Sequence, residues 1–143
     1  MYSGLIEKWF YKAILLLDGY TGDTKRRLIM IVLKTRKLKK YYGSGDTLVR
    51  ALDGVDLSVE RGEFVAVVGT SGSGKSTLLH MLGGLDRPTS GTVWVDQKDI
   101  SKLKDEELTI FRRRKIGFVF QSYNLVPVLN VYENIVLPVE LDG

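Results

Sequence analysis

The sequence predicts an α/β domain with a parallel sheet and an added β-rich N-terminal edge. Strand-like and helix-like patterns alternate along most of the 143 residues, which is the order of elements in α/β folds. The continuous apolar run at residues 64–68 is typical of a central strand that is covered on both faces. A glycine-rich loop and a helical pattern follow this run directly, so we expect a strand, a loop and a helix in succession.

The first 29 residues do not resemble the rest of the chain. A short amphipathic helix ending at Asp18 would place four apolar side chains on one face: Trp9, Phe10, Ile14 and Leu17. One interpretation is a helix that lies on a membrane surface. The other is a leader outside the domain, with the true start at Met30, since purine-rich codons for Arg26-Arg27 would form a ribosome-binding sequence. We expect a leader at 1–29 and one domain at 30–143.

The remaining elements are read from periodicity and from turn residues. Strand patterns cover residues 31–38, 49–59, 64–68, 92–95 and 116–120, and helical patterns cover 76–85 and 105–115. The second helix has an acidic first turn and a basic last turn, which its dipole favours. A final helical piece at 133–136 would be capped by Asn130 and end at Pro138.

Composition and charge exclude several classes of function. The chain has no cysteine and one histidine, His80, which excludes a disulfide framework, thiolate metal sites and a histidine-rich metal cluster. The net charge of +4 is concentrated in residues 1–40, which hold ten basic and three acidic residues. The domain itself is mildly acidic, which argues against nucleic acid as a partner. No apolar run approaches the roughly 20 residues of a membrane span, and no secretory signal is evident.

The segment at residues 69–77 carries the decisive chemistry, because it matches the pattern G-x-x-x-x-G-K-[ST] between a strand and a helix. Backbone N–H groups of such a loop wrap a polyphosphate, and the following helix directs its free N–H groups at the same phosphates. Lys75 would reach the β- and γ-phosphates, and the Ser76 hydroxyl would ligate Mg²⁺. The predicted phosphate-binding residues are Gly69, Thr70, Ser71, Gly72, Ser73, Gly74, Lys75, Ser76 and Thr77.

The residues around this loop resemble one family, the ATP-binding cassettes of ABC transporters. Residues 69–77 are similar to its Walker A motif and residues 118–121, Phe-Val-Phe-Gln, to its Q-loop. The resemblance is strongest to the branch that serves lipoprotein release, macrolide efflux and antimicrobial-peptide export. It covers residues 31–143 almost without a gap, with further matches at residues 85–91, 111–118, 124–127 and 131–135.

The resemblance implies roles for two further side chains. Tyr42 would be the aromatic residue that stacks on adenine, with Tyr41 as the competing candidate; spacing to Gly45 and Leu52 favours Tyr42. Gln121 would ligate Mg²⁺ or position the attacking water, so Gln121 and Lys75 are the expected catalytic residues. The implied cofactors are ATP and Mg²⁺.

The resemblance also implies an assembly. A P-loop NTPase core with a parallel sheet and an N-terminal antiparallel β subdomain would pair with a second ATP-binding subunit and a transmembrane permease. It would lie in the cytoplasm on the inner face of the membrane and power export or extraction by hydrolysing ATP. The family's signature motif, Walker B carboxylates and switch histidine have no counterpart here, so we expect weak nucleotide binding and negligible turnover by this chain alone. The alternative is a truncated nucleotide-binding protein without hydrolysis.

Overall fold

The computed structural model describes residues 14–15, 30–120 and 124–141, and every element lies in these ranges. The strands are β1 (Ile14–Leu15), β2 (Ile31–Tyr42), β3 (Val49–Glu60), β4 (Ser90–Val95), β5 (Lys98–Asp99) and β6 (Gly117–Phe118). The α-helices are α1 (Lys75–Leu82), α2 (Asp105–Lys115) and α3 (Val131–Glu140). Two 3-10 turns, η1 (Gly45–Thr47) and η2 (Ile100–Lys102), complete the set.

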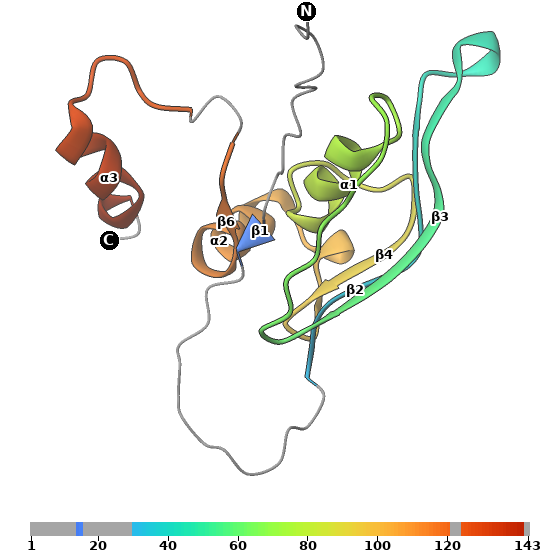
Figure 1. Ribbon diagram of the computed structural model, residues 1–143, viewed down its shortest axis with the longest axis horizontal. Coiled ribbons are helices and arrows are strands. Elements are labelled where there is room, and N and C mark those ends of the chain that lie inside the picture. Colours follow the sequence, from blue (N-terminus) through green and yellow to red (C-terminus); the bar gives the residue numbers. More distant parts are fainter. Residues whose placement is uncertain (1–13, 16–29, 121–123, 142–143) are drawn as a thin grey trace, which may run out of the picture.

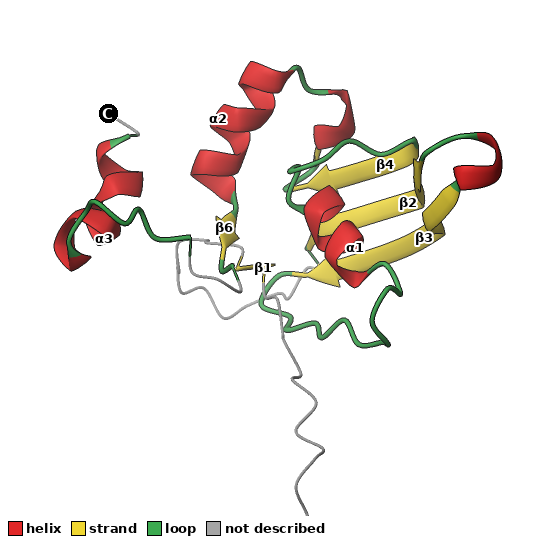
Figure 2. Cartoon of the chain, turned by 90° about the horizontal axis from the view of Figure 1, so that it is seen from above, coloured by secondary structure: helices red, strands yellow, loops and turns green. Residues whose placement is uncertain are grey.

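The main sheet contains four strands in the order β3-β2-β4-β5, all antiparallel to their neighbours. Strands β2 and β3 form a long hairpin closed by η1, and β4 returns to pair with β2 (Figures 1 and 2). This sheet is the β-rich edge that the sequence predicts. The expected strands at 31–38, 49–59 and 92–95 are all present, with β2 extended to Tyr42.

A β-bulge interrupts β2 in the middle of the sheet. Between Arg36 and Lys39 the register against β4 shifts by one residue, and the register against β3 shifts between Thr35 and Leu38. Lys37 has a φ of 45°, a left-handed conformation that is uncommon for a residue with a side chain. Gly91 on β4 packs directly against the bulge, because a Cβ there would lie 2.4 Å from the Lys37 carbonyl oxygen. The bulge therefore lies between β3 and β4, with its backbone packed against Gly91.

The core lies between one face of this sheet and α1. Helix α1 crosses over β2, β3 and β4, as Figure 2 shows, and buries Leu78, Met81 and Leu82. Opposing side chains of the sheet include Leu38 and Val93, both at most 1% exposed. Burying such a side chain contributes roughly 1.5–3 kcal/mol. The core continues to α2 through Leu108 and Phe111.

The predicted central strand at residues 64–68 is absent. This segment has no regular secondary structure, and Phe64 and Val68 are 83% and 65% exposed. A strand requires a neighbour for its backbone N–H and C=O groups, and no other strand of the described residues pairs with this run. The α/β class is confirmed, but the strand pairs in the described residues are all antiparallel.

The structure also corrects two predictions near the ends of the chain. Ile14 and Leu15 form β1, paired with β6, so the amphipathic helix is wrong at these positions; its other residues lie outside the described ranges. Helix α3 continues past Pro138 to Glu140. Pro138 has no N–H to donate to the Asn134 carbonyl, but the helical pattern continues beyond it, since the Leu141 N–H donates to the Leu137 carbonyl at 3.1 Å. Both views place α3 apart from the main sheet (Figures 1 and 2).

Candidate functional site

The glycine-rich loop leads directly into α1, as the sequence predicts. Gly74 is the N-cap residue of the helix, and the first backbone bond runs from the Leu78 N–H to the Gly74 carbonyl at 2.8 Å. The N–H groups of the first helical residues therefore have no acceptor within the helix and point back towards the loop. Together with the helix dipole they favour an anion at this position.

Gly74 also explains why the loop needs glycine at its junction with the helix. Its φ is 87°, and a Cβ would lie 2.3 Å from the Ala51 carbonyl oxygen on β3. The helix start is thus pressed against the backbone of the hairpin. This contact fixes the loop on β3 and leaves its other residues exposed to solvent.

Lys75 is the side chain that the loop surrounds. Its Nζ donates to the carbonyl oxygens of Gly69 at 2.7 Å and Thr70 at 2.6 Å, and it lies 3.4 Å from the Ser73 hydroxyl. The ammonium group therefore lies inside the curve of the loop, next to the start of α1. A cation beside free backbone N–H groups is an arrangement that can bind phosphate groups.

The remaining predicted loop residues lie in the same segment as Lys75. Ser76 is exposed at the start of α1. Gly69 closes the opposite side, since a Cβ there would lie 2.7 Å from the Ser73 hydroxyl. The structure thus brings together residues 69–77 in a single loop and helix start, as predicted.

Tyr42 lies at the end of β2 and is held by two side chains. Its hydroxyl donates to Asp86 Oδ2 at 3.1 Å, and the Lys40 Nζ lies 4.9 Å from its ring centroid. Lys40 also donates to Asp86 Oδ1 at 2.8 Å. Tyr42 is 42% exposed, so part of its ring is free to contact a ligand.

Tyr41 has a different set of neighbours. Its hydroxyl donates to Asp53 Oδ1 at 2.5 Å, and the cations of Lys39 and Arg50 lie over its ring at 5.9 and 5.7 Å. The Tyr41 hydrogen bond, followed by the one from Lys39, holds the pKa of Asp53 below its usual value. Tyr41 therefore belongs to a separate surface cluster, and Tyr42 is the better candidate to contact a nucleotide.

The carboxylate that holds Tyr42 is itself electrostatically stabilised. Partial burial raises the pKa of Asp86, but hydrogen bonds from Lys40, from the Arg87 N–H and from Tyr42 outweigh it, and the pKa lies below the ordinary value. Asp86 thus remains ionised at neutral pH. It accepts hydrogen bonds from Tyr42 and Lys40 together.

Sequence reasoning missed Lys40 and Asp86 as supports of Tyr42. They lie 46 residues apart, so no local spacing could have paired them. The proposed role of Gln121 concerns a residue outside the described ranges, although the two phenylalanines before it are described. Their rings, Phe118 and Phe120, are stacked with centroids 5.5 Å apart. The Phe118 ring also packs on Gly83 at the end of α1, where a Cβ would lie within 2.0 Å of it.

Comparison with known proteins agrees with the geometry of the loop. Residues 52–142 match the family described as ABC transporter. The chain is 49% identical to the macrolide export ATP-binding/permease protein MacB of Hyphomonas neptunium, over 78% of this chain and 17% of that protein. It is 48% identical to the lipoprotein-releasing system ATP-binding protein LolD of Geobacter metallireducens, over 78% of this chain and 50% of LolD.

A solved structure shares the fold. The dimeric post-hydrolysis state of the ATP-binding cassette MJ0796, bound to ADP and Pi, superposes with a TM-score of 0.74 and 46% identity, over 78% of this chain and 48% of that one. The chain spans about half the length of LolD and of MJ0796. In the part that the structure describes, no helix combines the length and apolar character needed to cross a membrane. The chain belongs to the ABC transporter family, as part of its ATP-binding domain.

Proposed function

We propose that this chain supplies the phosphate-binding half of an ATP-binding subunit that powers an ABC transporter. The observation that carries the proposal is the position of the Lys75 ammonium, which is surrounded by the loop and lies next to the free N–H groups of α1. A nucleotide triphosphate would replace the carbonyl contacts of Lys75 with contacts to its own phosphate oxygens.

The proposed roles of the other residues follow from the position of the Lys75 ammonium group. Ser76 would ligate Mg²⁺, which supplies charge neutralisation of the phosphates when bound. Tyr42, held by Asp86 and Lys40, would stack on the adenine ring. Gln121 would ligate the same ion or orient the attacking water. ATP and Mg²⁺ are thus the proposed cofactors.

The partners are proposed from the relatives. MacB is named as an export ATP-binding/permease protein and LolD as part of a lipoprotein-releasing system, and the MJ0796 cassette is a dimer. We therefore propose a second ATP-binding subunit and a transmembrane permease as partners, with the chain on the inner face of the cell membrane. Export or extraction of a peptide, lipoprotein or drug-like substrate is the proposed work of the whole assembly.

The test is nucleotide binding by the 143-residue chain, measured by titration calorimetry with ATP and Mg²⁺. Lys75→Ala should weaken binding of both ATP and pyrophosphate by at least about tenfold, because it removes the only side-chain cation inside the loop among the described residues. Lys98→Ala is the matched control, because Lys98 is exposed on β5, away from the loop.

Equal binding by the Lys75→Ala variant and the parent would contradict the proposal. Phosphate release measured on the same samples separates binding from hydrolysis. We expect binding without appreciable turnover by this chain alone. Turnover that depends on Lys75 would contradict that expectation and would assign hydrolysis to the chain itself.

A further inference from the structure

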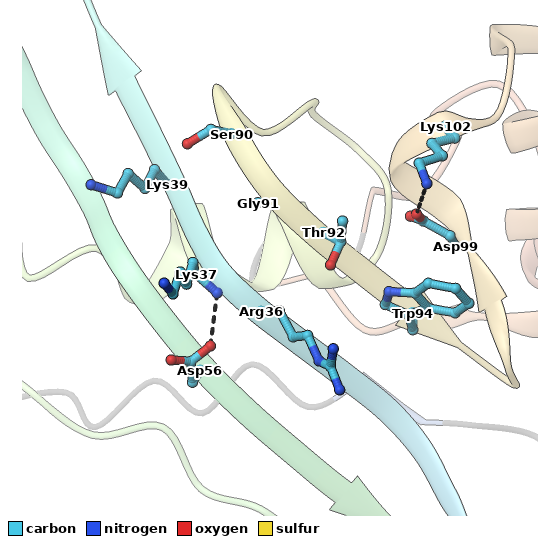
Figure 3. Close-up of a pocket in the computed structure, with 10 residues that line it drawn as sticks. All are labelled: Arg36, Lys37, Lys39, Asp56, Ser90, Gly91, Thr92, Trp94, Asp99 and Lys102. Carbon is cyan, nitrogen blue, oxygen red and sulfur yellow. Dashed lines mark hydrogen bonds and ion pairs between the residues drawn. The ribbon is translucent and has the colours of Figure 1, made fainter.

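The outer face of the main sheet, opposite α1, carries an open hollow of about 740 Å³. Its lining includes Arg36, Lys37, Lys39, Asp56, Trp94 and Lys102, from strands β2, β3 and β4 and from η2 (Figure 3). We call it the outer hollow. None of the predicted nucleotide-binding residues lines it, so it is separate from the site described above.

The bulge in β2 shapes the outer hollow. Lys37 adopts its left-handed conformation there, and its N–H donates to Asp56 Oδ1 at 2.7 Å. A bulge re-aims side chains and adds local twist, and strained backbone is often found at functional sites. Here the bulge lies under the hollow and presents Arg36 and Lys37 in succession.

The charge of the outer hollow is incompletely balanced. Lys39 pairs with Asp53 at 2.9 Å, and Lys102 pairs with Asp99 at 3.2 Å. The side chains of Arg36 and Lys37 have no acidic partner among the described residues, and both are exposed. Asp56 also lines the outer hollow and has no ion pair among the described residues, so it offsets part of this positive charge. An anionic ligand that extends over Arg36 and Lys37 would supply the rest.

The arrangement of the cations indicates the shape of that ligand. In Figure 3 the side chains of Lys37 and Arg36 point in different directions, and Lys102 lies beyond Trp94 on the other side of β4. Cations spread along a hollow do not converge on one phosphate group, but they can contact successive charges of an extended chain. Trp94, 37% exposed, offers an apolar contact among them. Tryptophan and arginine are the residues that most often dominate binding at protein interfaces.

Other anionic partners fit less well. A flat bilayer surface cannot follow a hollow, and proteins that bind single-stranded nucleic acid stack successive bases on several aromatic side chains. Trp94 is the one aromatic side chain that lines the outer hollow. We propose that the outer hollow binds an extended acidic segment of another protein.

The test uses Trp94 as the reporter. Trp9 and Trp94 are the two tryptophans of the chain, so Trp9→Phe leaves a single fluorophore in the outer hollow. An acetylated octaglutamate peptide should change the Trp94 emission in a saturable way, and the change should weaken as salt is added. Arg36→Gln should weaken this binding by at least about fivefold, because it removes one of the two unpaired cations.

Lys98→Gln is the control, because it removes the same charge from β5 at a position outside the outer hollow. An equal loss of octaglutamate affinity in both variants would show that only the net charge of the protein matters, and it would overturn the proposal. A response to vesicles of anionic phospholipid or to oligothymidine, with none to octaglutamate, would also overturn it. Lys75→Ala should leave octaglutamate binding unchanged. A failure of the peptide-binding proposal can therefore be distinguished from a failure of the proposed nucleotide site.

Discussion

Gly74 tests the geometry of the loop at the scale of a single residue. Gly74→Ala would place a methyl group 2.3 Å from the Ala51 carbonyl oxygen and hold alanine at a φ of 87°. We expect the free energy of unfolding to fall by about 3 kcal/mol, since a backbone clash adds to left-handed strain. Denaturant unfolding measures this directly.

Gly62→Ala is the matched control for Gly74. Gly62 has a φ of 77°, and nothing lies within 4 Å of the position its Cβ would take. Gly62→Ala should lower the free energy of unfolding by about 1 kcal/mol, because it adds backbone strain but no clash. Equal losses at the two positions would show that the contact with Ala51 contributes nothing to stability.

Tyr42 and Tyr41 can be distinguished by comparing ATP with pyrophosphate. Tyr42→Ala should weaken ATP binding by about tenfold, because base stacking contributes about 1–3 kcal/mol. Pyrophosphate has no base, so its binding should not change. Tyr41→Ala should affect neither ligand, since its hydroxyl and ring contact Asp53, Lys39 and Arg50. Calorimetric titration of both variants measures all four affinities, and a loss of ATP binding on Tyr41→Ala alone would reverse the assignment.

Residue spacing predicts the loop well and its supports poorly. Residues 69–77 are contiguous, so the pattern alone places Lys75 beside the start of a helix. The contact of Asp86 with Lys40 depends on how the hairpin meets the segment after α1. Such contacts follow from tertiary packing, which sequence periodicity does not encode.

Helix α3 depends on its N-terminal cap, because none of its residues is buried. Asn130 Oδ1 accepts from the Glu133 N–H at 2.9 Å, and Glu133 Oε2 accepts from the Asn130 N–H at 2.7 Å. Asn130→Ala should cost about 1 kcal/mol and accelerate amide exchange within α3 by about fivefold. Hydrogen exchange resolved by residue measures this effect.

Glu140→Ala is the control variant for Asn130→Ala. Glu140 is the last residue of α3 and takes no part in the N-terminal cap. It should leave exchange in α3 almost unchanged. Rapid exchange throughout α3 in the parent protein would show that the cap does not hold the helix in solution.

At the scale of elements, local signals are more dependable than the pairing of strands. Helix α2 matches the predicted range 105–115, since its dipole-favoured charges and periodicity are local. The apolar run at 64–68 signals burial, but it contains nothing that specifies which strand should pair with it. The run is exposed and unpaired among the described residues, so its apolar character alone does not make it a strand.

At the scale of the whole molecule, several of the most exposed apolar side chains among the described residues lie in two segments. Phe64, Val65 and Val68 follow the hairpin, and Val128, Val131 and Val139 lie in and before α3. Such surface favours association with other apolar groups. Phe64→Ser should lower the fluorescence of the apolar dye ANS and change the free energy of unfolding by no more than about 0.5 kcal/mol.

Thr92→Ser controls for the handling of the Phe64 variant, because Thr92 is half-buried on β4 and lines the outer hollow. Unchanged dye binding in Phe64→Ser would show that this region is covered in solution. A large loss of stability would show that Phe64 packs in the folded chain.

The β2 bulge has a consequence far from where it occurs. In a regular strand, side chains alternate strictly between the two faces, and one additional residue reverses the alternation beyond it. Leu33 and Thr35 point inward before the bulge, and Leu38 does so after it. The inward-pointing positions of β2 thus change from odd-numbered to even-numbered residues at the bulge. Beyond it, Tyr42 contacts Asp86 and Tyr41 contacts Asp53. The bulge near Lys37 thus helps to set which tyrosine faces Asp86, and we expect a chain shortened by one residue there to turn Tyr42 away from Asp86.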